Sequence, residues 1–93
     1  MSKRIYKFTL SPLSINTMEL PYGAEVLDVQ IQHGSIRLWA LGDFNKTPVR
    51  REFLVTGTGM DVPDDADYVA TVQMDDGARV WHVFEIPTSG YIA

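Results

Sequence analysis

The sequence contains no cysteine among its 93 residues. Disulfide bonds, thiolate nucleophiles, and zinc or iron–sulfur sites held by cysteine are therefore excluded. The absence also fits a reducing compartment, and we expect a cytoplasmic protein.

Long apolar segments are missing as well. No apolar run approaches the roughly 20 residues that a transmembrane helix needs. Residues 1–7 are basic but lead into no apolar stretch, so we expect no secretory signal peptide. An apolar content of 45% over 93 residues predicts one folded domain, residues 1–93, with an ordered core at about 4–86 and a less ordered tail at 87–93.

Positive charge is scarce in the second half of the chain. Residues 1–52 carry seven Lys or Arg and five Asp or Glu, whereas residues 53–93 carry one Arg and seven acids. Binding to a nucleic-acid duplex needs many phosphate contacts from clustered basic residues, so we expect no duplex binding. A small anion held by one or two arginines remains compatible with the net charge of −4.

A helical pattern is also absent, and the dominant apolar period is two, which is typical of strands. The sequence predicts strands at Arg4–Leu10, Ile15–Leu20, Glu25–Gln32, Ser35–Leu41, Arg50–Thr56, Tyr68–Met74 and Ala78–Ile86. Seven short strands separated by turn residues predict an all-β, mainly antiparallel fold with little or no helix. A small sandwich and a small barrel both fit this pattern.

Two of the predicted hairpins resemble each other. Residues 29–39 read VQIQHGSIRLW and residues 72–81 read VQMDDGARVW. Each segment has Val-Gln, then a glycine, then Arg, an apolar residue and Trp. The match indicates either an internal duplication or the general similarity of β-hairpins.

Turn geometry predicts the register of each hairpin. A two-residue turn at His33-Gly34 pairs Gln30 with Arg37. A three-residue loop at 75–77 pairs Gln73 with Arg79. Both hairpins are then expected to carry Gln, Arg and Trp on one face and apolar side chains on the other.

Arg37, Trp39, Arg79 and Trp81 form the candidate site. Trp offers a flat stacking surface, and Arg offers a planar fork that matches phosphate or carboxylate. A nucleotide site would use one Arg for a phosphate and one Trp for the base. A subunit interface anchored by Trp and Arg, and Trp packing inside one subunit, are the two alternatives.

Lys46, Arg50 and Arg51 are a second candidate for an anion contact, because positive charge is densest there. The glycine-flanked segment 57–59 lacks the Lys of a phosphate-binding loop and is interpreted as a sharp turn.

No catalytic or metal centre is indicated. The acids at 61, 64, 65 and 67 lack the spacing of a calcium loop and are interpreted as solvated. His82 alternates with Val80 and Phe84, which predicts an inward-facing histidine, and His33 lies in a turn. No nucleophile and base stand out together, so we expect no enzyme, no cofactor and no metal.

The order of several short motifs resembles a known family. These motifs are Ile5-Tyr6-Lys7, Val29-Gln30-Ile31-Gln32, Leu38-Trp39-Ala40-Leu41, Thr56-Gly57-Thr58-Gly59, Pro63-Asp64-Asp65 and His82-Val83-Phe84-Glu85. Together they are similar to small proteins of unknown function that occur widely in tailed phages and prophages. The resemblance covers residues 5–85 and implies a phage accessory protein acting in the host cytoplasm.

Two function hypotheses follow. The first is a non-enzymatic homo-oligomer that binds a small anionic ligand and sequesters a nucleotide signal of host immunity. The alternative is a protein–protein interaction or virion-associated accessory protein without a small ligand. Independently of function, we expect self-association as a dimer or a higher symmetric ring, because exposed aromatic strands on a small domain favour a covering partner.

Overall fold

The computed structural model describes residues 2–88. Seven strands and one short 3₁₀ turn follow one another along the chain. The strands are β1 (Arg4–Leu10), β2 (Ser14–Pro21), β3 (Glu25–Gln32), β4 (Ser35–Gly42), β5 (Pro48–Gly57), β6 (Asp67–Met74) and β7 (Arg79–Ile86), and the turn, η1 (Asp75–Gly77), precedes β7. The described residues contain no helix that is long and apolar enough to cross a membrane. The predicted less ordered tail lies largely outside the described residues, at 89–93.

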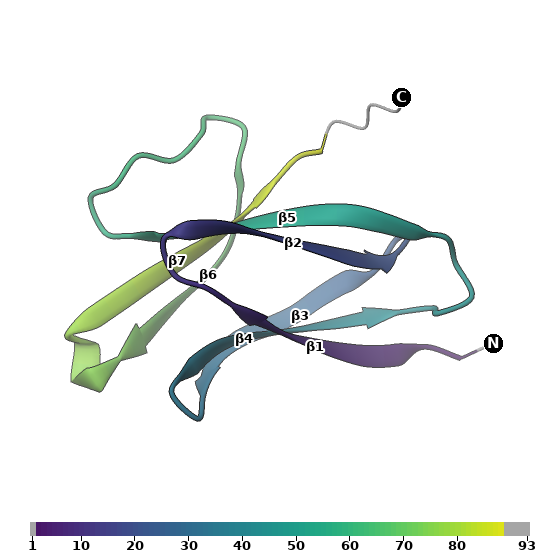
Figure 1. Ribbon diagram of the computed structural model, residues 1–93, viewed down its shortest axis with the longest axis horizontal. Coiled ribbons are helices and arrows are strands. Elements are labelled where there is room, and N and C mark those ends of the chain that lie inside the picture. The colour runs from purple at the N-terminus through teal and green to yellow at the C-terminus, as the bar shows by residue number, and fades with distance from the viewer. Residues whose placement is uncertain (1, 89–93) are drawn as a thin grey trace.

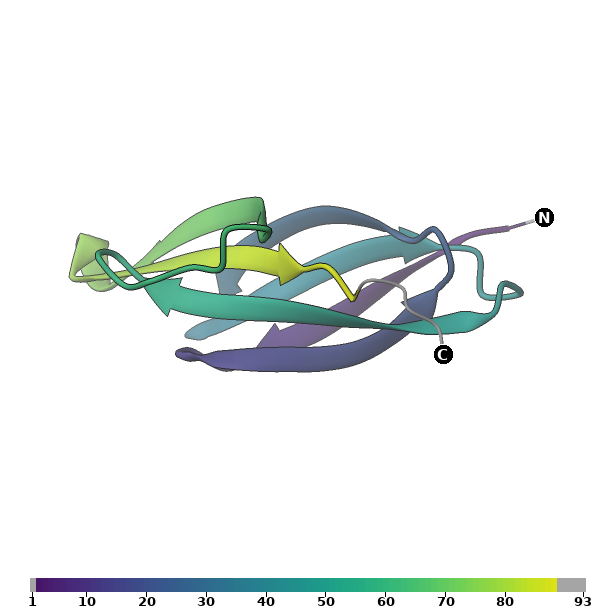
Figure 2. The same cartoon turned by 90° about the horizontal axis from the view of Figure 1, so that it is seen from above.

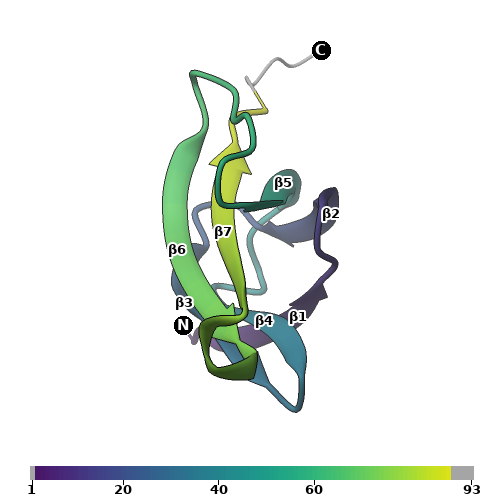
Figure 3. The same ribbon diagram turned by 90° about the vertical axis from the view of Figure 1, so that its left-hand side faces the viewer.

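The strands form two antiparallel sheets, which confirms the predicted all-β sandwich. One sheet has the order β1-β4-β3 and the other has the order β2-β5-β7-β6 (Figure 1). Edge strands β3 and β6 run beside each other where the two sheets meet, as the views from above and from the end both show (Figures 2 and 3). Each sheet packs on the other with one face, and its second face points away from the core.

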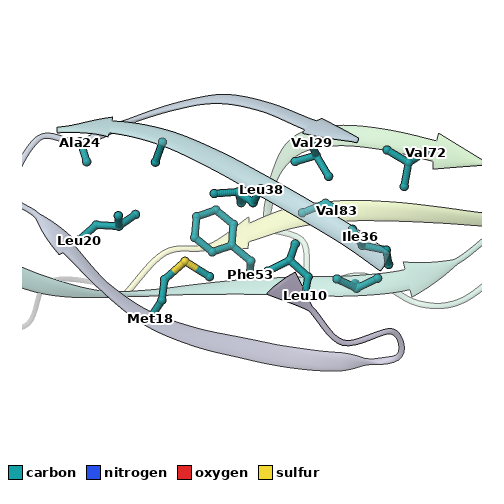
Figure 4. Close-up of a cluster of buried hydrophobic side chains, with 12 residues drawn as sticks. Leu10, Met18, Leu20, Ala24, Val29, Ile36, Leu38, Phe53, Val72 and Val83 are labelled. Atoms are coloured by element: carbon teal, nitrogen blue, oxygen red, sulfur yellow. The ribbon is translucent and has the colours of Figure 1, made fainter. Parts of the chain in front are cut away.

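The core lies between the two sheets and is built from alternate residues of each strand. Phe53 of β5 is fully buried at its centre, next to Leu38 of the opposite sheet (Figure 4). The other buried apolar residues are Leu10, Met18, Leu20, Ala24, Val29, Ile36, Ala40, Val55, Val72 and Val83. Strand β4 shows the period clearly, because every second residue from Ile36 onward is buried.

The first hairpin confirms the predicted register. His33 and Gly34 both have positive φ, 53° and 76°, as a two-residue type I′ turn requires. The ladder pairs Gln30 with Arg37 and continues with Asp28 opposite Trp39. Arg37 and Trp39 therefore share the outward face of their sheet.

The predicted register of the second hairpin is wrong by one residue. Its loop has four residues rather than three, because Ala78 adopts a helical conformation and donates its N–H to the carbonyl of Asp75. Met74 consequently pairs with Arg79, and Val72 pairs with Trp81. A shift of one residue exchanges the two faces of a strand. Trp81 thus faces inward with buried Val72, and packs against the core.

Candidate functional site

The outward face of the β1-β4-β3 sheet carries the first half of the predicted site. Arg37 lies between Thr9 of β1 and Gln30 of β3, and the next outward row along β4 contains Lys7, Trp39 and Asp28. We call these six residues, Lys7, Thr9, Asp28, Gln30, Arg37 and Trp39, the Trp39 face. Side chains two residues apart on one strand lie about 7 Å apart along it. That spacing places a cationic fork beside a flat indole ring.

Arg37 differs from the other four arginines because it has no partner within residues 2–88. Arg4 lies over the ring of Phe44 at 4.2 Å, and the remaining three form ion pairs with nearby carboxylates. The Nε atom of Arg37 is buried without a hydrogen-bond partner in this part of the chain. Since an arginine carries five N–H donors, the four N–H groups on its terminal nitrogens remain for an approaching acceptor.

The charge on the Trp39 face favours an anion. Lys7 and Arg37 contribute two positive charges, whereas Asp28 contributes one negative charge. Both carboxylate oxygens of Asp28 are already occupied, one by the N–H of Val29 at 2.8 Å and one by the side-chain amide of Gln30 at 2.7 Å. Within residues 2–88 the Lys7 ammonium donates only to the amide oxygen of Gln32, at 3.2 Å.

Arg79 and Trp81, the other half of the predicted site, lie on a different face. The Arg79 guanidinium forms an exposed ion pair with Asp75, with nitrogen–oxygen distances of 2.6 and 2.8 Å. Trp81 packs against the core opposite Gly57, and its indole N–H is buried without an acceptor in residues 2–88. The two predicted Arg–Trp pairs therefore belong to opposite sheets, one facing outward and one inward.

The second predicted anion contact, Lys46, Arg50 and Arg51, does not form one cluster of side chains. Arg50 and Arg51 are neighbours on a strand, so their side chains leave opposite faces of the sheet. Arg50 is exposed, and its guanidinium lies 3.9 Å from the Glu52 carboxylate. Arg51 lies on the opposite face of the strand, which faces the core. Lys46 lies in the loop before β5.

Arg51 forms the best-connected ion pair of the described residues. Its Nε and one terminal nitrogen donate to the two oxygens of Glu85, at 2.6 and 2.8 Å, and the other terminal nitrogen donates to the carbonyl of Ala24 at 2.6 Å. The hydrogen bonds to Glu85 raise the pKa of Arg51 above its ordinary value, against the opposing effect of burial. Since Ala24 leads into β3, the clamp joins the two sheets.

The cleft above this clamp has a volume of about 380 Å³. Besides Arg51 and Glu85 it is lined by three further carboxylates, those of Glu25, Asp28 and Asp67. Four acids against one committed arginine disfavour an anionic ligand there. An anion is therefore better accommodated on the Trp39 face than in this cleft.

Sequence reasoning missed a chain of polar side chains on the outward face of the β2-β5-β7-β6 sheet. The predicted inward orientation of His82 is wrong, because its two neighbours in the strand, partly buried Trp81 and buried Val83, face the core. The two ring nitrogens of His82 lie 2.7 Å from the Thr58 hydroxyl and 3.0 Å from the Thr71 hydroxyl. The alternation with Phe84 was visible in the sequence, but not which face was the core.

Comparison with known families gives one match. Residues 1–91 match the model of a domain of unknown function, DUF7352, and the chain belongs to this family. No curated protein and no solved structure matches the chain significantly.

Proposed function

We propose that this member of the DUF7352 family is a non-enzymatic binding protein that takes a small anionic ligand with a planar ring on its Trp39 face. One observation carries the proposal: Arg37 is the arginine without a partner in residues 2–88, and it stands beside Trp39 on one outward face. A phosphate meets Arg37 and Lys7, while the attached ring stacks on the indole.

Nucleotides combine both features. A purine or pyrimidine is a stacking ring, and its phosphate is a bidentate acceptor for a guanidinium. The resemblance of residues 5–85 to small phage proteins gives this chemistry a role. We propose a homo-oligomeric phage accessory protein that sequesters a nucleotide signal of host immunity in the host cytoplasm.

A thermal-shift screen with cyclic nucleotides and ADP-ribose derivatives tests the proposal. A ligand that binds only the folded state raises the melting temperature. At a concentration of 100 times its dissociation constant, such a ligand adds about 2.7 kcal/mol to the free energy of unfolding. Absence of any shift across the panel at millimolar concentration speaks against a nucleotide ligand.

Arg37→Ala and Trp39→Ala should each weaken binding of the ligand found by that screen about tenfold to a hundredfold. Arg37→Ala removes a charged hydrogen bond worth about 2 kcal/mol, and Trp39→Ala removes a stacking contact of similar value. Arg79→Ala is the matched control, because Arg79 belongs to the other sheet and already forms an ion pair with Asp75. Calorimetric titration checks all three variants. If only Arg79→Ala loses affinity, the second hairpin is the binding site.

A second candidate function is docking on another protein without any small ligand. Neither Arg37 nor Trp39 lines any of four well-defined clefts in residues 2–88, which favours docking, since small-ligand sites are usually concave. Ile5, at 59% exposure, lies on the same outward face one row further along and adds apolar area. If this second function holds, the Trp39→Ala variant should no longer bind the protein partner. Nucleotides should then leave the melting temperature of the parent protein unchanged.

A further inference from the structure

The outward face of the β2-β5-β7-β6 sheet carries an apolar row that crosses all four strands. The ladder places Ile15 beside Leu54, Leu54 beside Phe84, and Phe84 beside Tyr68. We call these residues the Ile15–Tyr68 row. Its two ends are strongly exposed, Ile15 at 56% and Tyr68 at 62%.

Strand β7, in the middle of this sheet, carries apolar side chains on both faces. In β7, Val83 faces the core while Phe84 and Ile86 face outward. Apolar side chains on both faces are typical of a strand covered on both sides. The outward positions of the β1-β4-β3 sheet instead mix polar Lys7 and Thr9 with apolar side chains such as Ile5.

The row is held in a fixed shape. The rings of Tyr68 and Phe84 meet edge to face with centroids 5.6 Å apart. The Tyr68 hydroxyl is anchored to the Thr71 hydroxyl at 2.8 Å, and Thr71 is bonded in turn to His82. A rigid aromatic surface loses little conformational entropy when a partner covers it.

We propose that a second copy of the chain covers this face, with a two-fold axis running along the Ile15–Tyr68 row. The two outward sheets then pack face to face with aligned strands, as in a β-sandwich. Each residue of the row meets its own counterpart in the partner subunit.

Charge complementarity supports this occupant. On one side of the row the outward positions hold Glu19, Arg50 and Glu52, and on the other side they hold His82 and Thr71, whereas Thr56 is buried there. A two-fold axis along the row places the acidic side over the hydroxyl and imidazole side of the partner subunit. Glu19 and Glu52 then lie away from the carboxylates of the partner subunit.

The area of this face is of the same order as the surface that a specific dimer buries. Four strands about 4.8 Å apart, with a rise of about 3.3 Å over eight residues, span a plane of roughly 500 Å². Side-chain relief raises the accessible surface of such a face toward the roughly 800 Å² per subunit that specific interfaces bury.

Sedimentation of charge variants tests the proposal. We expect a parent dimer at tens of micromolar, and a dissociation constant at least about 100-fold higher for Ile15→Lys and for Tyr68→Lys, because each ammonium meets its own copy across the axis. Ile5→Lys is the matched control, since Ile5 is equally exposed at 59% but lies on the opposite sheet. Circular dichroism verifies that the variants keep the β fold. A monomeric parent, or a dimer that dissociates with Ile5→Lys and not with Ile15→Lys, overturns the proposal.

Cross-linking tests the axis itself, because the chain has no cysteine of its own. Ile15→Cys should give a covalent dimer with a short bismaleimide, and Ile5→Cys should not. The reverse pattern, or no cross-link at Ile15→Cys, overturns the arrangement. The outcome is independent of the proposed ligand, whose residues lie on the other sheet.

Discussion

Trp81→Ala should lower the free energy of unfolding by about 3 kcal/mol, whereas Trp39→Ala should change it by less than about 1 kcal/mol. The two tryptophans occupy matching positions in two similar sequence segments, but only Trp81 packs against the core, opposite buried Val72. Truncating it removes a large apolar ring and leaves a cavity. Trp39 faces outward beside Lys7 and Asp28, so its removal leaves the core intact.

Urea unfolding of both variants measures this difference. For a domain of this size, 3 kcal/mol corresponds to a fall in melting temperature of roughly 10–25 °C. Trp81→Phe is the matched control, because it keeps an aromatic ring and removes an indole N–H that has no acceptor within residues 2–88. It should cost clearly less than Trp81→Ala. Equal losses for Trp39→Ala and Trp81→Ala would contradict the observed register.

The contrast between the two tryptophans shows how far the sequence was predictive. The period of two located every strand to within two residues at each end, since alternation is a local property of the chain. The His33-Gly34 pair also predicted the first register, because a two-residue type I′ turn requires positive φ at both positions. After Met74 the sequence predicted a three-residue loop, and this prediction was wrong. Ala78 joined the loop there, and one residue was enough to turn Trp81 inward.

The candidate site was predictable only in part. Arg37 and Trp39 share a face through strand alternation alone, so the sequence predicted their proximity. The Arg51–Glu85 pair joins residues 34 positions apart, and no local pattern connects them. The same limit applies to the Ile15–Tyr68 row, because only the pairing order β2-β5-β7-β6 places its members side by side.

Arg51→Ala should lower the free energy of unfolding by about 2–3 kcal/mol. The Arg51 and Glu85 side chains are mostly buried, with exposed fractions of 18% and 24%. Removing the guanidinium leaves the Glu85 carboxylate without its partner and takes one donor from the carbonyl of Ala24. Breaking a buried pair costs more than the pair itself contributes, since the remaining charge stays desolvated. Solvent access to this pair keeps the loss below the 3–5 kcal/mol of a fully buried one.

Arg50→Ala is the matched control, because Arg50 is the adjacent arginine on the same strand. Its side chain is 68% exposed and lies 3.9 Å from Glu52, so we expect a change within about 0.5 kcal/mol. Arg51→Lys keeps the charge but loses the fork that binds both Glu85 oxygens, and should fall between the two alanine variants. Chemical denaturation of the three variants gives the order directly.

The pH dependence of this difference follows from the sign of the shift. The pKa of Arg51 is raised in the folded protein, so the stabilisation by its proton is complete below the unfolded pKa and is lost only as the pH rises through the folded pKa. From about pH 6 to about pH 9 the arginine stays charged in both states. The gap between the parent and Arg51→Ala should therefore be constant over that range. A gap that closes before pH 9, or a loss as large for Arg50→Ala, would show that Arg51 does not clamp the two sheets together.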